Sequence, residues 1–134
     1  MLPSSRYIRC AGYEIHCTEW GAPEAPVVIA WHGPARTGRD MDELAQHLSS
    51  RFRVICPDTI GRGLSQWSSR PAQEYCLAFY ARIATNLFDQ LGIQLAHWVG
   101  PSMGGGVFRK TCRWGQSPAI HRCTAGRLKH WRKA

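Results

Sequence analysis

The sequence predicts an α/β protein with a mostly parallel sheet and helices on the faces of that sheet. Apolar runs of strand length alternate with segments whose apolar residues recur every three to four positions. This alternation is typical of parallel strands joined by helices. Glycine and polar residues gather after the carboxyl ends of the strands, where open sheets of this class bind ligands. We therefore expect functional residues in those turns.

Five segments carry strand patterns. Residues 7–10 and 13–20 predict two short strands around an Ala-Gly pair, and the second has polar residues on both of its faces. Residues 26–31 form a continuous apolar run rich in β-branched residues, as expected for a strand covered on both sides. Residues 52–56 give a further strand, stopped by Pro-Asp, and residues 95–99 give the last one.

Two segments carry helical patterns. Asp40 and Glu43 have the spacing of a capping box, which predicts a helix beginning at Asp40. Its apolar face consists of Met41, Leu44, Ala45 and Leu48. Pro71 suits the first turn of a second helix, which is predicted to run to about Gly92. The apolar face of that helix consists of Cys76, Phe79, Ile83, Leu87 and Leu91.

The composition fits a soluble globular protein, and 134 residues leave room for one modest domain. No apolar run approaches the length of a membrane span, so no membrane partner is expected. Arg6 and Arg9 are not followed by an apolar core, so no secretory signal is expected. The six cysteines are scattered through predicted strands and a helix, which favours reduced thiols in a cytoplasmic protein.

The net charge of +8 is confined to the end of the sequence. Residues 1–105 hold nine Lys or Arg and nine Asp or Glu, whereas residues 106–134 hold eight Lys or Arg and no acid. We therefore expect a domain over 1–105 and a basic, acid-free tail over 106–134 that is disordered or non-native, as a shifted reading frame would give. With Trp114 and Trp131 as stacking surfaces, the tail could bind nucleic acid nonspecifically, as a consequence of charge and without a dedicated function.

The tail also contains residue types that bind metals, namely Cys112, His121 and Cys123. Their spacing matches no standard zinc pattern and lacks a fourth ligand. We expect no metal and no other cofactor.

The strand at 95–99 leads directly into a Gly-x-Ser-x-Gly motif at Gly100, Ser102 and Gly104. This is the strand–turn–helix signature of a nucleophile elbow, in which a sharp turn lifts the serine clear and strains its backbone. Side chains in place of Gly100 and Gly104 would collide in so tight a turn. The following helix would point its free N–H groups at a developing oxyanion. The motif predicts Ser102 as a catalytic nucleophile; a glycine-rich loop that happens to hold a serine is the alternative.

Three motifs follow one another in the sequence: His32-Gly33, Pro57-Asp58 through Gly61-x-Gly63-x-Ser65, and Gly100-x-Ser102-x-Gly104. Through these motifs, residues 6–105 resemble the N-terminal half of the α/β-hydrolase fold family, in particular its bacterial esterase-like serine hydrolases. The resemblance implies an incomplete α/β-hydrolase fold and a small-molecule acyl substrate.

The resemblance also implies roles for individual residues. Ser102 matches the nucleophile, the Met103 N–H matches one oxyanion donor, and the loop at Gly33 and Pro34 matches the segment that supplies the other. Asp58 and the loop at 61–65 match a structural segment. His32 matches a residue that braces the oxyanion loop and is not the catalytic base.

The sequence departs from the family pattern in three places. Pro34 has no N–H, and loss of one oxyanion donor costs roughly 10²–10³ in rate. The triad acid and histidine of the family follow further strands, before which this sequence ends, and nothing positions His121 or His130 near Ser102. From Val107 onward, the expected small, apolar helix gives way to basic residues, glycine and proline. Two classes therefore stay open: a serine hydrolase acting on carboxylic esters or related acyl substrates, and a truncated, catalytically inactive remnant with a basic tail.

Overall fold

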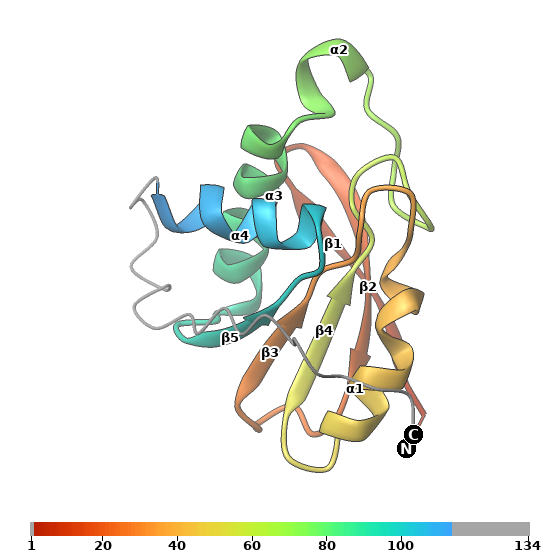
Figure 1. The fold of residues 1–134 in the computed structure, drawn as a ribbon, viewed down its shortest axis with the longest axis vertical. Helices are drawn as coiled ribbons and strands as arrows, with labels where there is room; N and C mark the ends of the chain where they lie inside the picture. The colour runs from red at the N-terminus through yellow and green to blue at the C-terminus, as the bar shows by residue number, and fades with distance from the viewer. Residues whose placement is uncertain (1, 114–134) are drawn as a thin grey trace.

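A computed structural model describes residues 2–113, and its centre is a five-stranded sheet in the order β1-β2-β4-β3-β5 (Figure 1). The strands are β1 (Ser4–Cys10), β2 (Tyr13–Trp20), β3 (Val27–Ala30), β4 (Arg53–Pro57) and β5 (Ala96–Val99). The pairs β3–β4 and β3–β5 are parallel, and β2 is antiparallel to both β1 and β4. Within the described chain, β2 alone thus runs against the other strands. The predicted α/β class is confirmed, with a mixed sheet.

Helices cover both faces of the sheet (Figure 1). The helical elements are the 3₁₀ helix η1 (Gly38–Met41), α1 (Asp42–Leu48), α2 (Pro71–Glu74), α3 (Leu77–Leu91) and α4 (Met103–Arg113). The α1 side encloses a cluster that includes Met41, Ala45 and Val54. The α3 and α4 side encloses a larger cluster in which the rings of Trp31 and Trp98 stack with centroids 5.6 Å apart. Two separate cores therefore hold the sheet between its helices.

The predicted capping box at Asp40 is wrong. The chain turns earlier, because the Thr37 hydroxyl accepts a hydrogen bond from the Arg39 N–H and so caps η1. The helix α1 follows at Asp42, and its N-cap residue Met41 makes no side-chain capping bond. The Asp40 carboxylate instead lies 3.4 Å from the Arg36 guanidinium.

The helix predicted from Pro71 to Gly92 is broken in two. Tyr75 leaves helical geometry at φ −87° and ψ 67°, and Cys76 is extended and exposed. Gly61 packs against the Tyr75 ring, so the aromatic side chain is held by the loop at 61–65 and not by a helical turn. Pro71 does stand in the first turn of α2, and Gly92 ends α3 in the left-handed conformation.

The helix α4 continues across the boundary that composition suggests at residue 105. It runs to Arg113, and Val107 and Thr111 are buried on its inner side. The Thr111 hydroxyl donates to the Val107 carbonyl at 2.7 Å, so this buried hydroxyl has a hydrogen-bond partner within the helix. The change in charge at residue 106 therefore falls inside an ordered helix. The expectations for Cys112, Trp114, His121, Cys123, His130 and Trp131 concern side chains outside the described set.

Four cysteines are described, and all are free thiols. Cys10, Cys17 and Cys56 are buried, and Cys76 is exposed. Burial raises the pKa of Cys10 to about 11 and that of Cys56 to about 12, and it raises the pKa of Cys17 well above the usual value. Buried thiols of this kind are chemically inert because the thiolate is the reactive form.

No helix within residues 2–113 is long and apolar enough to cross a membrane.

Candidate active site

Ser102 lies in the turn between β5 and α4, where the sequence motif predicts it. Its φ is +52°, in the left-handed region that residues other than glycine rarely adopt. Such a conformation costs about 1–3 kcal/mol and persists only where the surrounding structure imposes it. The side chain is exposed. This geometry is that of a nucleophile elbow.

The two glycines of the motif make the tight turn possible. A Cβ atom on Gly104 would lie 2.1 Å from the Trp31 carbonyl oxygen at the end of β3. A Cβ atom on Gly100 would lie 2.4 Å from the backbone of Gly104. Both positions are closed to any larger residue by neighbouring backbone. These distances agree with the steric reason for glycine on each side of Ser102.

The first turn of α4 begins immediately after Ser102. The Ser102 carbonyl accepts from the Gly105 N–H at 3.1 Å and from the Gly106 N–H at 3.2 Å. The Met103 N–H, the first of the helix, donates to no backbone carbonyl among residues 2–113. Free N–H groups at a helix start attract negative charge. The Met103 amide is therefore available as an oxyanion donor.

The segment after β3 lies beside this turn. The Trp31 N–H donates to the Val99 carbonyl at 2.9 Å, which joins the ends of β3 and β5. His32 is fully buried, and its Nδ1 hydrogen-bonds to the Gly33 carbonyl at 2.6 Å while its Nε2 accepts from the Thr59 N–H at 2.9 Å. Burial lowers the pKa of His32. A neutral imidazole with its proton on Nδ1 therefore braces Gly33, as the resemblance implies.

Arg62 fixes the remainder of this loop. Its Nε donates to the Pro34 carbonyl at 3.0 Å, and its Nη1 donates to the Tyr80 hydroxyl at 2.8 Å. The guanidinium also lies over the rings of Tyr75 and Tyr80, at 5.7 and 5.4 Å from their centroids. Pro34 itself offers no N–H. The segment at Gly33 and Pro34 is thus held rigidly without the amide that the family pattern uses.

Ser102 thus lies in a strand–turn–helix elbow at the carboxyl edge of a sheet with the order β1-β2-β4-β3-β5. The family model described as the alpha/beta hydrolase fold matches residues 26–112 of the 134. The chain belongs to the α/β-hydrolase fold family.

Individual hydrolases are similar to this chain over most of its length. A 3-hydroxybutyrate-oligomer hydrolase of Cupriavidus necator is 42% identical over 88 residues, which cover 65% of this chain and 30% of that protein. A 2-hydroxymuconate semialdehyde hydrolase of Pseudomonas putida is 35% identical over 103 residues, which cover 76% and 36%. An α/β hydrolase of Novosphingobium aromaticivorans matches with a TM-score of 0.80 and 28% identity, covering 92% of this chain and 44% of that one. The chain therefore spans 30–36% of the length of these two curated relatives.

The Asp58 carboxylate joins three separate segments of this α/β-hydrolase chain through hydrogen bonds. Asp58 is buried, and its carboxylate accepts from the N–H groups of Gly38 at 2.7 Å and Leu64 at 3.0 Å. A Cβ atom on Gly63 would lie 2.4 Å from the same carboxylate. The structural role that the resemblance implies for Asp58 and the loop at 61–65 agrees with these contacts.

His16 was not identified from the sequence as a partner of Asp58. Its Nδ1 lies 2.9 Å from Asp58 Oδ2, and both side chains are almost completely buried. The strand pairing places Cys17 opposite Pro57, which sets His16 beside Asp58. The available signal was a polar residue on each face of the second strand, but the pairing of β2 with β4 cannot be obtained from spacing.

The Ser102 hydroxyl makes no hydrogen bond to any residue that the structure describes. The histidines of the described part lie elsewhere: His16 beside Asp58, His32 beneath Gly33, His47 bonded to the Glu43 carbonyl, and His97 against Phe52. Residues 2–113 also contain no group of three His, Cys, Asp or Glu side chains that could hold a metal ion. A base for Ser102 would have to come from outside the described residues.

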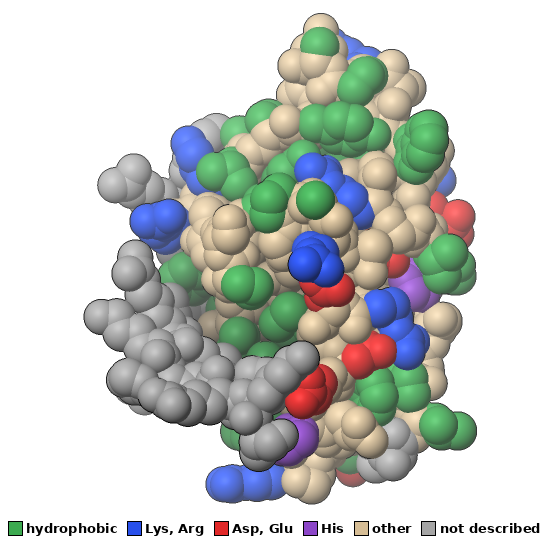
Figure 2. Space-filling model, turned by 45° about the vertical axis from the view of Figure 1, so that its right-hand side comes forward, with side chains coloured by type: hydrophobic (Ala, Val, Ile, Leu, Met, Phe, Trp, Pro, Cys, Tyr) green, Lys and Arg blue, Asp and Glu red, His purple; other side chains and the backbone are tan. Residues whose placement is uncertain are grey.

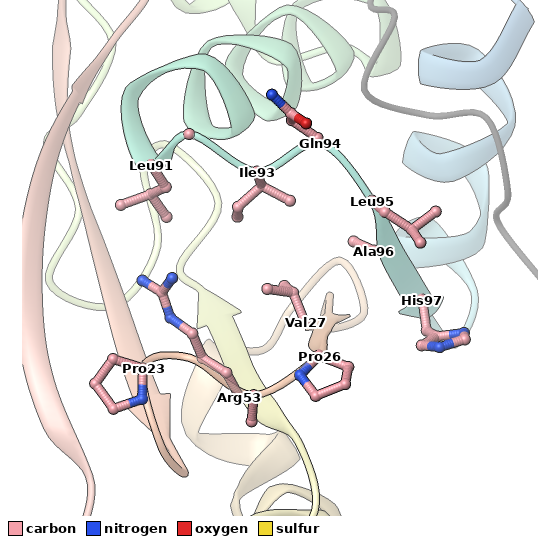
Figure 3. Close-up of a pocket in the computed structure, with 12 residues that line it drawn as sticks. Pro23, Pro26, Val27, Arg53, Leu91, Ile93, Gln94, Leu95, Ala96 and His97 are labelled. Carbon is pink, nitrogen blue, oxygen red and sulfur yellow. The ribbon is translucent and has the colours of Figure 1, made fainter.

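The hollow shown in Figure 3 is not part of this site. It has a volume of about 330 Å³ and is lined by residues such as Val27, Arg53 and Ile93. These residues lie at or before the amino ends of β3, β4 and β5, whereas Ser102 follows the carboxyl end of β5. A second hollow of about 510 Å³ lies along α3, beside Phe79 and Arg82. Neither hollow has Ser102 in its lining.

Proposed function

We propose that Ser102 is the nucleophile of a serine hydrolase that acts on carboxylic esters or related acyl substrates. The observation that carries the proposal is the left-handed backbone of Ser102, held between β5 and the first turn of α4. This conformation is costly and serves no packing purpose for an exposed serine. Its use is to present the hydroxyl to the carbonyl carbon of a substrate and the next amide to the oxygen of the same carbonyl group.

The reaction follows from that presentation. The Ser102 oxygen attacks the ester carbonyl carbon, its proton passes to a base, and the carbonyl oxygen gains negative charge near the Met103 N–H. Collapse of this intermediate breaks the ester bond, releases the alcohol with the proton from the base, and leaves an acyl group on Ser102. Water then releases the acid. This step requires a base and an orienting acid that residues 2–113 do not place at Ser102.

The surroundings of the elbow suit an apolar acyl group. A Cβ atom on Gly106 would lie 3.3 Å from the side chain of Leu77, so Leu77 stands over the first turn of α4. Leu77 is 36% exposed. Figure 2 shows hydrophobic side chains gathered on the upper part of the molecule, where α2 lies. The exposed Leu77 side chain beside the elbow supports an acyl substrate and a small-molecule partner. The free thiols support a cytoplasmic location.

The second candidate is a catalytically inactive hydrolase remnant with a basic tail. It is favoured by the Ser102 hydroxyl, which has no hydrogen-bond partner within residues 2–113, and by the missing N–H at Pro34. Such a chain would keep the elbow by descent and would bind or release no acyl group through it.

Phosphonylation of serine by a fluorophosphonate probe, which releases fluoride, separates the two candidates. Ser102 lies in the tryptic peptide 83–109, and labelling of that peptide is measured for the wild type and for Ser102→Ala. Ser50, an exposed serine after α1, is the internal reference. The hydrolase proposal expects slow labelling at Ser102 that exceeds labelling at Ser50, with little or no ester turnover by the chain alone. Equal labelling of the two serines would support the inactive remnant and refute the proposal.

A further inference from the structure

Ser5, His16 and Asp58 form a second hydrogen-bonded series, remote in the sequence from the elbow. The Ser5 hydroxyl lies 3.0 Å from His16 Nε2, and His16 Nδ1 lies 2.9 Å from Asp58 Oδ2. This series has the spatial order of a catalytic triad: a hydroxyl, an imidazole hydrogen-bonded through both nitrogens, and a carboxylate. A triad is recognised by its geometry and not by the order of its residues along the chain. The nucleophile position is exposed, and the other two are buried.

The hydrogen bonds of Asp58 determine which nitrogen of His16 carries the proton. The carboxylate can only accept, so the bond between them requires a proton on His16 Nδ1. In the neutral imidazole, Nε2 then has a free lone pair that accepts from the Ser5 O–H. The Gly38 and Leu64 N–H groups hold the carboxylate in place from two sides. His16 is therefore oriented as a base toward Ser5.

The strands fix the two side chains relative to one another. In the antiparallel pairing of β1 and β2, Tyr7 is opposite His16 and Ser5 is opposite Thr18, so Ser5 is a diagonal neighbour of His16 on the same face. The Tyr7 ring packs on the imidazole with centroids 5.0 Å apart, which covers one side of it. The position of Ser5 thus depends on regular strand geometry and needs no loop to close.

We propose that Ser5 is a second nucleophilic serine, activated by His16 and Asp58, that accepts acyl groups from esters with good leaving groups. The Ser5 oxygen bonds to the acyl carbon as its proton passes to His16 Nε2. The bond from the acyl carbon to the leaving oxygen breaks, and that oxygen departs as an aryl oxide or takes the proton from His16. The product is an acyl ester on Ser5. Ser5 is exposed on a regular strand, a setting that suits small, activated acyl donors.

The proposal is independent of the role of Ser102, and peptide mapping keeps the two apart. Ser5 lies in the tryptic peptide 1–6 and Ser102 in the peptide 83–109. Ser4 is the matched control, because it is an exposed serine on the same strand. A positioned general base contributes about 10²–10⁴ in rate, and we expect fluorophosphonate labelling of Ser5 to exceed that of Ser4 by roughly fivefold or more.

Four variants complete the experiment: Ser5→Ala, Ser4→Ala, Ser102→Ala and His16→Gln. Labelling of peptide 1–6 should fall to the Ser4 level in Ser5→Ala and in His16→Gln, and it should persist in Ser4→Ala and Ser102→Ala. A smaller ratio between Ser5 and Ser4, or an unchanged rate in a folded His16→Gln chain, would overturn the proposal.

A thiol version of the experiment decides the case in which His16→Gln does not fold. The exposed positions allow Ser5→Cys and Ser4→Cys without a change in the core. An imidazole base raises the thiolate fraction of a neighbouring thiol, so iodoacetamide should alkylate the thiol of Ser5→Cys roughly fivefold faster or more than that of Ser4→Cys. Equal alkylation rates would show that His16 does not act as a base toward position 5.

Discussion

Two Gly→Ala substitutions in the first turns of α4 should differ in their effect on the free energy of unfolding: one should be destabilising, and the other neutral or stabilising. In Gly104→Ala, the new Cβ would lie 2.1 Å from the Trp31 carbonyl oxygen, so β3 and α4 would have to separate by about 1 Å. Trp31 cannot yield, because its N–H is bonded to the Val99 carbonyl and its ring is stacked on Trp98. In Gly106→Ala, the nearest atoms belong to the side chain of Leu77 at 3.3 Å, and that side chain is partly exposed and can turn.

The magnitudes follow from two opposing effects. Alanine improves on glycine within a helix by at most about 1 kcal/mol. Overpacking against fixed structure costs about 1–3 kcal/mol, and the upper end applies where the neighbour is backbone. Gly104→Ala should therefore lower the free energy of unfolding by about 2 kcal/mol, while Gly106→Ala should leave it unchanged or raise it by up to about 1 kcal/mol. The two variants should therefore differ by about 2–3 kcal/mol.

Urea denaturation followed by circular dichroism measures this difference. The slope of the transition should remain that of the wild type, and the midpoint should fall for Gly104→Ala alone. Equal midpoints for the two variants would refute the argument that the approach of β3 to the elbow requires glycine at position 104.

Three further outcomes are expected. Burial lowers the pKa of His32 below 6.5, so folding favours its neutral form. The resulting contribution to the free energy of unfolding is fully present above pH 6.5 and is lost as the pH falls below that value. Urea midpoints should therefore decline as the pH is lowered through this range, and His32→Gln should reduce the decline. Iodoacetamide, followed by peptide mapping, should modify Cys76 in the native chain much faster than the three buried cysteines, and equal rates would contradict their burial. Gly63→Ala combines a left-handed φ of +53° with a Cβ position 2.4 Å from the Asp58 carboxylate, so it should destabilise by about 3 kcal/mol; Gly12→Ala, with φ +87° and open space around it, should cost only about 1 kcal/mol by the same denaturation measurement.

The elements that local chemistry determines could be predicted from the sequence. The apolar run at 26–31 is a strand because its side chains are buried on both faces. Ser102 lies at a tight turn because the glycines on either side leave room for the neighbouring backbone. Such signals lie within a few neighbouring residues. They were sufficient for the α/β class and for the location of the elbow, whereas the brace formed by His32 was expected only from the resemblance to the family.

The features that depend on contacts distant in sequence could not be predicted. The break at Tyr75 arises because Gly61 and Arg62 hold the tyrosine ring, and nothing in the helical spacing of 71–92 signals those partners. The pairing of His16 with Asp58 arises from the order β2-β4-β3, in which strands adjacent in space are separated by a helix in sequence. A spacing pattern contains no information on either contact.

Ser102 and Ser5 each have a different part of what acyl transfer requires: Ser102 has an oxyanion donor, and Ser5 has a base. Ser102 has the strained turn and a free helix amide but no base among residues 2–113, whereas Ser5 has a base and an orienting carboxylate on an ordinary strand. Hydrolases without their triad keep roughly 10³–10⁴ in rate from the oxyanion hole and binding, and loss of one donor at Pro34 removes about 10²–10³ of this. A positioned base alone supplies about 10²–10⁴. With a small probe that gains little from binding, Ser5 should therefore be labelled before Ser102. The reverse order would mean that a base from outside the described residues reaches Ser102 and completes the hydrolase site.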